Sequence, residues 1–193
     1  MRSSIAASLL TVAALGACAD NPAAPIPGGG DPENISSVSV VLTPVTGGAA
    51  LRSTIEDPDG TQLPGAPTPA SAVLALRQGV TYAGAIEILN DLDAANIVDV
   101  IDEIETESAF HRLFYTLSCA GVSVPVAAMN RDDQVPPQPL GTTFQLVVAA
   151  DAPATTSCTL TVELRHFETD KGDGAGSNFE TDLDLDFPVS IAP

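Results

Sequence analysis

The amino-acid sequence predicts an all-β domain, an antiparallel sandwich of about seven to eight short strands. Between residues 36 and 193, apolar side chains mostly recur at every second position, which is the period of a strand with one buried and one solvated face. Turn-forming glycine, proline and aspartate separate these stretches. Sheets must therefore supply the packed layers, and an immunoglobulin-like β-sandwich is the expected architecture.

The alternation is clearest near the C-terminus. There the apolar face is Leu183, Leu185, Phe187, Val189 and Ile191, and the wet face is Asp182, Asp184, Asp186 and Ser190. Pro188 has no N–H to donate, so this strand is expected to lie at a sheet edge there. In chain order the expected strands cover residues 38–42, 51–56, 82–88, 110–118, 122–128, 143–150, 157–167 and 183–191, with proline-rich connections at 64–69 and 136–139.

One segment breaks the period of two. Ile97, Val98, Ile101 and Ile104 recur at helical spacing, and Asn96 is placed to cap them. The spacing predicts a short helix over 96–106 that crosses between strands.

The N-terminus has the three parts of a bacterial lipoprotein signal. Arg2 supplies the positive charge, residues 5–15 form an apolar stretch too short to span a bilayer, and the run Leu15-Gly16-Ala17-Cys18 resembles a lipobox. Residues 1–17 are therefore expected to be removed and Cys18 to be lipidated. The alternative is an ordinary signal peptide that ends near a cysteine. Ala19 stands where lipoproteins retained in the inner membrane often carry Asp, which favours the outer membrane.

Residues 18–35 are expected to form a tether between this anchor and the sandwich domain of residues 36–193. The segment is rich in proline and glycine and has no apolar period. Fully extended, it could reach on the order of 50 Å at ~3 Å per residue. Which face of the membrane the domain occupies stays open.

The chain is strongly acidic, with 25 Asp and Glu against 7 Lys and Arg and a net charge of −18. Such a surface argues against nucleic acid and against direct adsorption to anionic lipid headgroups. It suits a solvated exterior, a cationic partner or the binding of divalent cations.

The three cysteines divide into an anchor and a pair. Once Cys18 takes lipid, Cys119 and Cys158 remain in an oxidising compartment, where a disulfide is expected. Opposed residues of an antiparallel strand pair have numbers that add to a constant. A bond between the two cysteines therefore places His111 opposite His166.

The same register extends beyond the histidines. It puts Glu107 opposite Asp170, with Glu168 between the two levels on the same parity. Two imidazoles with two or three carboxylates form the ligand set of a zinc or copper site. The hypothesis is a metal held by His111, His166 and some of the three carboxylates. The alternative is that both histidines lie at the rim of the core, hydrogen-bonded to neighbouring carboxylates.

Other chemistry is poorly supported. The segments 170–174 and 57–60 suggest calcium loops, but neither has the ligand spacing or closing Glu of an EF-hand, and both read as turns. The sequence has no G-x-S-x-G elbow, no H-E-x-x-H and no glycine-rich phosphate loop. The expectation is a protein that is not an enzyme.

The domain also resembles a group of uncharacterised bacterial envelope lipoproteins labelled "type 1 periplasmic binding fold superfamily protein". The resemblance covers about residues 36–191 and implies export, lipidation and a β-rich domain. His111 and His166 fall in that group's two histidine-bearing segments. The segments that carry the likeness are VSVVLTP, DPDG, GVTYAGAIEILN, IDEIETESAFHRLFYTL, PLGTTFQLVV, LTVELRHF and NFETDLDLDFPVSI.

Together these observations favour a membrane-anchored cell-envelope lipoprotein that acts as a non-enzymatic binding or accessory module. In a more specific form of this hypothesis, the module captures a divalent metal or other ligand for an outer-membrane partner such as a transporter. The alternative is a structural or adhesive envelope lipoprotein with no small-ligand site. An enzyme, the third class, would need a histidine with a nucleophile in reach.

Overall fold

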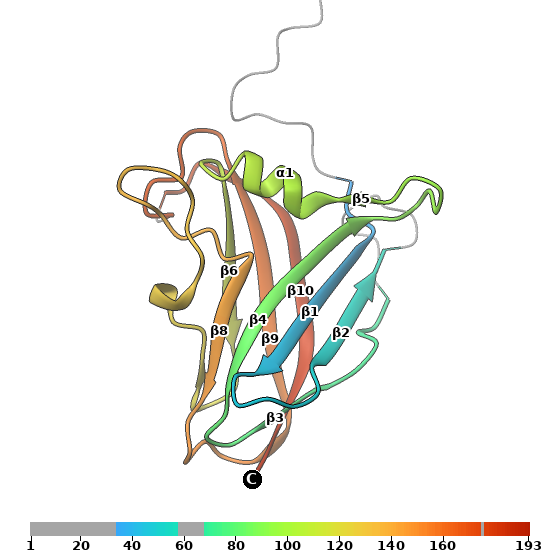
Figure 1. Ribbon diagram of the computed structural model, residues 1–193, viewed down its shortest axis with the longest axis vertical. Coiled ribbons are helices and arrows are strands. Elements are labelled where there is room, and N and C mark those ends of the chain that lie inside the picture. Colours follow the sequence, from blue (N-terminus) through green and yellow to red (C-terminus); the bar gives the residue numbers. More distant parts are fainter. Residues whose placement is uncertain (1–33, 58–67, 175) are drawn as a thin grey trace, which may run out of the picture.

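The computed structural model describes residues 34–57, 68–174 and 176–193, and it has two β-sheets packed face to face (Figure 1). The predicted all-β sandwich is therefore confirmed. The expected signal peptide, Cys18, most of the tether, the greater part of the 57–60 turn and most of the 64–69 connection lie outside the described residues.

The first sheet has the order β2-β1-β4-β8-β7, with β5 beside β4. Its strands are β1 (Ser37–Pro44), β2 (Leu51–Glu56), β4 (Thr81–Asn90), β5 (Val98–Asp99), β7 (Val122–Ser123) and β8 (Thr143–Val148). The second sheet has the order β3-β10-β9-β6. Its strands are β3 (Leu74–Arg77), β6 (His111–Leu117), β9 (Thr155–Phe167) and β10 (Phe179–Ala192).

All eight expected strands are present, and the short β3 and β5 are additional. The pairing differs from the prediction at one place, because β3 lies parallel to β10 while the other pairs are antiparallel. The segment 122–128 is also less extended than expected. Only Val122–Ser123 is strand, and Val126–Ala128 forms the 3-10 helix η1 after Pro125, whose ring allows no ladder N–H.

The helix is shorter than predicted. It is α1 (Val100–Thr106), and its N-cap is Asp99, whose side chain accepts a hydrogen bond from the Ile101 N–H at 3.0 Å. Asn96 is not the cap, because Val98 and Asp99 pair with the end of β4 before the helix begins. Figure 1 shows α1 lying across one end of the sandwich. Val100 and Ile104 bury its inner face. No helix among the described residues is long and apolar enough to cross a membrane.

The core lies between the sheets and follows the predicted alternation. In β10 the five predicted apolar residues are buried and Asp184 and Asp186 are exposed. Asp182 is the exception: it is buried, and it is the extra residue where the register of β10 against β9 shifts between Thr181 and Leu183. Within the described residues, β3 joins β10 only from Val189 onward, so Pro188 lies where one side of β10 has no paired strand, as its missing N–H predicts.

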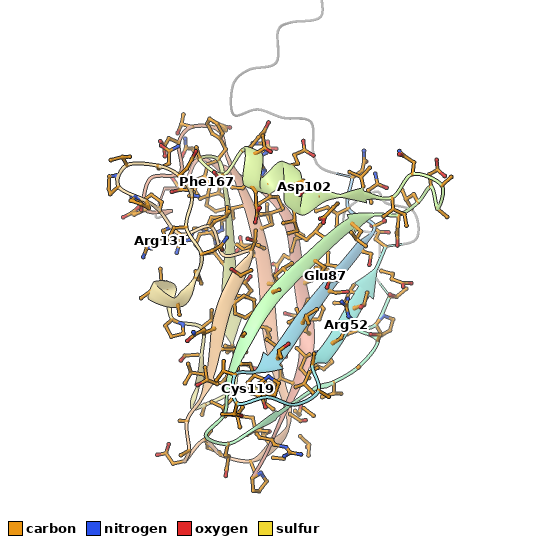
Figure 2. The ribbon with its side chains drawn as sticks, in the orientation of Figure 1. Arg52, Glu87, Asp102, Cys119, Arg131 and Phe167 are labelled. Carbon is orange, nitrogen blue, oxygen red and sulfur yellow. A yellow bond between two sulfur atoms is a disulfide. The ribbon has the colours of Figure 1, made fainter. Side chains whose placement is uncertain are left out.

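The register between β6 and β9 is the one that the cysteines predict. Cys119 and Cys158 form a disulfide with their Cα atoms 5.3 Å apart, and the paired residues run from Leu117 opposite Leu160 to His111 opposite His166. Figure 2 shows Cys119 at one end of the sandwich and Phe167, the neighbour of His166, at the other. The disulfide and the histidine pair therefore lie at opposite ends of the same two strands.

Candidate metal centre

The two histidines face the core at the end of the sandwich that α1 covers. His111 is the first residue of β6 and His166 lies at the end of β9, and both have the side-chain parity of Leu113 and Leu164, which are fully buried. The imidazole ring centroids are 4.4 Å apart with the ring planes tilted by 33°. His111 is 0 % exposed and His166 7 % exposed. Antiparallel pairing thus presents two imidazoles side by side in a nearly dry environment.

Glu107 joins the pair from a different element. It is the C-cap residue of α1, where its N–H donates to the Glu103 carbonyl, and the chain then turns so that the Phe110 N–H donates to the Glu107 carbonyl. This turn brings His111 next to Glu107. One ligand atom from each of Glu107, His111 and His166 lies within 4.8 Å of the others.

The hydrogen bond of His111 indicates which ring nitrogen could bind a metal. His111 Nδ1 lies 3.2 Å from the Glu107 carbonyl oxygen, which can only accept. In the neutral ring Nδ1 therefore carries the proton and Nε2 carries the lone pair. A backbone carbonyl that orients a ligating histidine in this way is a usual feature of metal sites.

The three residues together could hold a metal ion. Metal bonds of about 2 Å require ligand atoms roughly 3 to 4 Å apart, so a small side-chain adjustment would close the group on one ion. Glu107 is half-buried and has the flexible side chain that allows this, whereas both imidazoles are enclosed. Three protein ligands leave a fourth position for water or an exchanging ligand.

Two of the five predicted ligands, Glu168 and Asp170, are not part of this group. Strand β9 ends at Phe167, and the chain turns away there, so both carboxylates are exposed. Asp170 instead accepts a hydrogen bond from the Gly172 N–H at 2.9 Å. The predicted pairing of Glu107 with Asp170 is wrong, because β6 begins only at His111.

A buried ion pair, which the sequence did not predict, lies next to this group of candidate ligands. Lys171 Nζ is 2.8 Å from Asp132 Oδ2, and both side chains are fully buried. The lysine also donates to the carbonyls of Ser108 and His111. One feature of the sequence points to this ion pair: Lys171 is the only lysine in the chain.

Burial and pairing act in opposite directions on these two groups. Burial is the largest influence on Lys171 and lowers its pKa, while the hydrogen bond to Asp132 opposes the change. Burial would raise the pKa of Asp132, but the hydrogen bonds from Lys171 and from the N–H groups of Gln138 and Gln134 outweigh it, so the pKa lies below its ordinary value. A charged pair is therefore held beside the histidines.

Comparison of the chain with protein-family models, with curated proteins and with solved structures found no match. The geometry of the site and the N-terminal sequence are therefore the grounds on which a function can be proposed.

Proposed function

We propose that this chain is a lipid-anchored lipoprotein of the bacterial cell envelope whose sandwich domain binds a divalent transition metal as a non-enzymatic capture module. The observation that carries the proposal is the convergence of one ligand atom each from Glu107, His111 and His166 within 4.8 Å. Glu107 directly follows α1, while His111 and His166 belong to β6 and β9, and the pairing of these strands brings the two histidines together.

The ligand types favour zinc or copper over calcium or magnesium. Imidazole nitrogen suits zinc and copper, whereas calcium and magnesium prefer shells made of oxygen. Two of the three candidate ligands are imidazoles. The acidic surface adds a long-range attraction for cations of any kind, which raises the encounter rate without choosing the metal.

The cellular address is proposed from the N-terminal sequence. The signal of residues 1–17, the lipidated Cys18 and the tether to residue 35 would hold the domain at the outer membrane, where it could pass its ion to a transporter or another envelope protein. Glu107 is the partly exposed member of the group and marks the side from which an ion would enter and leave.

Isothermal titration of the mature lipoprotein in detergent with Zn²⁺ and with Cu²⁺ tests the proposal. We expect one ion per chain at micromolar concentration, and binding at least about tenfold weaker in Glu107→Gln and in His166→Gln. Glu168→Gln is the matched control, because it makes the same chemical change at a carboxylate outside the group. If the wild-type protein releases no heat with either metal, the proposal is wrong.

A structural or adhesive role is the second candidate function. Three large apolar side chains are exposed near the connection from β4 to α1, Leu92 at 50 %, Ile97 at 58 % and Val98 at 43 %. Exposed apolar side chains that gather at one place favour contact with another protein. In that case metal titration gives no heat, and replacing Leu92 and Ile97 by Asn abolishes co-purification with an envelope partner.

A further inference from the structure

The only lysine of the chain lies against the segment that carries two of the three candidate metal ligands. Lys171 Nζ donates to the carbonyls of Ser108 and His111, the second of these at 3.0 Å, and its backbone N–H donates to the Ala109 carbonyl at 2.9 Å. One residue therefore holds three carbonyls of the turn between α1 and β6. That turn begins at Glu107 and ends at His111.

Asp132 completes the set of acceptors and fixes the lysine in place. An ammonium group has three N–H donors. Two of them go to the carbonyls of Ser108 and His111, and Asp132 Oδ2 forms an ion pair with the ammonium at 2.8 Å. The other carboxylate oxygen accepts from the backbone N–H groups of Gln138 at 2.6 Å and Gln134 at 3.2 Å. The loop before β8 thus holds Asp132, and Asp132 holds Lys171.

A lysine suits these carbonyl and carboxylate partners better than an arginine would. An ammonium is a compact charge that can point its donors at three divergent acceptors, whereas the planar fork of arginine matches acceptors that lie in one plane. The chain otherwise uses arginine for its positive charges. A buried ion pair contributes little net stability, because removing two charges from water offsets their attraction, so stability alone is weak grounds for this pair.

We propose that Lys171, anchored by Asp132, is a positioning residue of the metal site: it holds the turn from Glu107 to His111 so that both ligands face His166. This inference rests on the proposed metal binding. The pairing of β6 with β9 already places His166 opposite His111, so the ligand that depends most on the lysine is Glu107, which lies outside both strands.

A double-mutant cycle on the mature lipoprotein tests this. Lys171→Met is combined with Asp132→Asn, since a lone buried charge would be strongly destabilising. We expect the pair to weaken Zn²⁺ or Cu²⁺ binding about tenfold, as loss of supporting groups around a metal does. Added to Glu107→Gln, the same pair should cause no further loss, because the lysine acts through Glu107.

The control variant removes an exposed ion pair by corresponding substitutions, in which a cation is replaced by Met and a carboxylate by its amide. Arg52 and Glu87 lie 2.5 Å apart with side chains 50 % and 44 % exposed, and Arg52→Met with Glu87→Gln should leave metal binding unchanged. Full additivity of the Lys171/Asp132 pair with Glu107→Gln, or wild-type affinity in that pair, overturns the inference while leaving metal binding itself established. Absence of binding in the wild type overturns the proposed function instead.

A second measurement needs no substitution. Because Lys171 is the only lysine, acylation by an amine reagent reports on this residue once peptide mapping separates it from the chain terminus. If metal and lysine stabilise the same turn, saturating Zn²⁺ or Cu²⁺ slows acylation of Lys171, since the two effects are linked. An unchanged rate at saturating metal counts against the positioning role.

Discussion

His111 and His166 lie directly opposite each other across β6 and β9, with their ring centroids 4.4 Å apart. At the other end of the same two strands Cys119 and Cys158 are bonded. The disulfide and the pairing of the two histidines thus follow from the same strand register. Because strand side chains alternate, a slip of one residue would turn one histidine out of the core while its partner stayed inside.

Removing the disulfide should cost stability and keep the histidine pair. The bond joins residues that are 39 apart in the sequence, and loops of this size contribute roughly 2 to 4 kcal/mol by restricting the unfolded chain. We expect Cys119→Ala with Cys158→Ala to lower the free energy of urea unfolding by that amount. The two histidine ring signals in NMR spectra should keep their wild-type shifts. Large shifts would show that the bond, and not the strand pairing, holds the rings together.

The Lys171–Asp132 pair should contribute to acid sensitivity. The pKa of Asp132 in the folded protein lies below the ordinary value of 3.8, so the unfolded chain binds its proton first as the pH falls. The stabilisation is present above about pH 4 and is lost as the pH falls toward the folded pKa. Urea unfolding of the wild type should therefore lose more stability between pH 5 and pH 3 than Lys171→Met with Asp132→Asn. Parallel curves would contradict this.

Asp184 should affect the pH dependence of stability in the opposite direction to Asp132. Partial loss of contact with water raises the pKa of this carboxyl, with repulsion from Glu163 and Asp186 adding to the effect and Arg165 opposing it. A raised folded pKa means that the ionised form costs stability at neutral pH and that the cost disappears as the pH falls through that pKa. Because the side chain is exposed, we expect Asp184→Asn to raise the unfolding free energy at pH 7 by only roughly a few tenths of a kcal/mol. The gain should vanish near pH 3, and Asp186→Asn is the neighbouring comparison.

Cys18 carries the prediction about the anchor. Expressed in a bacterium with lipoprotein processing, the wild-type chain should incorporate labelled palmitate and sediment with membranes. Cys18→Ser should do neither and should leave the fold of residues 36–193 intact, as circular dichroism would show. A wild-type product cleaved without lipid would favour the ordinary signal peptide instead.

Sequence alone predicted the sandwich, its eight main strands and the register of β6 against β9. The strands depend on the period of two, which is visible in short stretches of sequence. The register depends on pairing the two cysteines that remain once Cys18 is assigned to the anchor. Glu168 and Asp170 lie elsewhere than predicted because β9 ends at Phe167, so the register of the strand pair does not extend to them. Lys171 and Asp132 could not be paired from sequence, since their contact depends on two loops meeting in space. The helix began later than predicted because β4 pairs with Val98 and Asp99.

The described chain enters the sandwich near α1. The Ser36 N–H donates to the Leu89 carbonyl, Leu89 pairs with Asp99, and Asp99 caps the helix whose last turn leads to Glu107. With Cys18 anchored as proposed, the end of the domain that carries the metal group would be the end nearest to the anchor. A partner in the same membrane would then approach the domain from the side that carries the metal group.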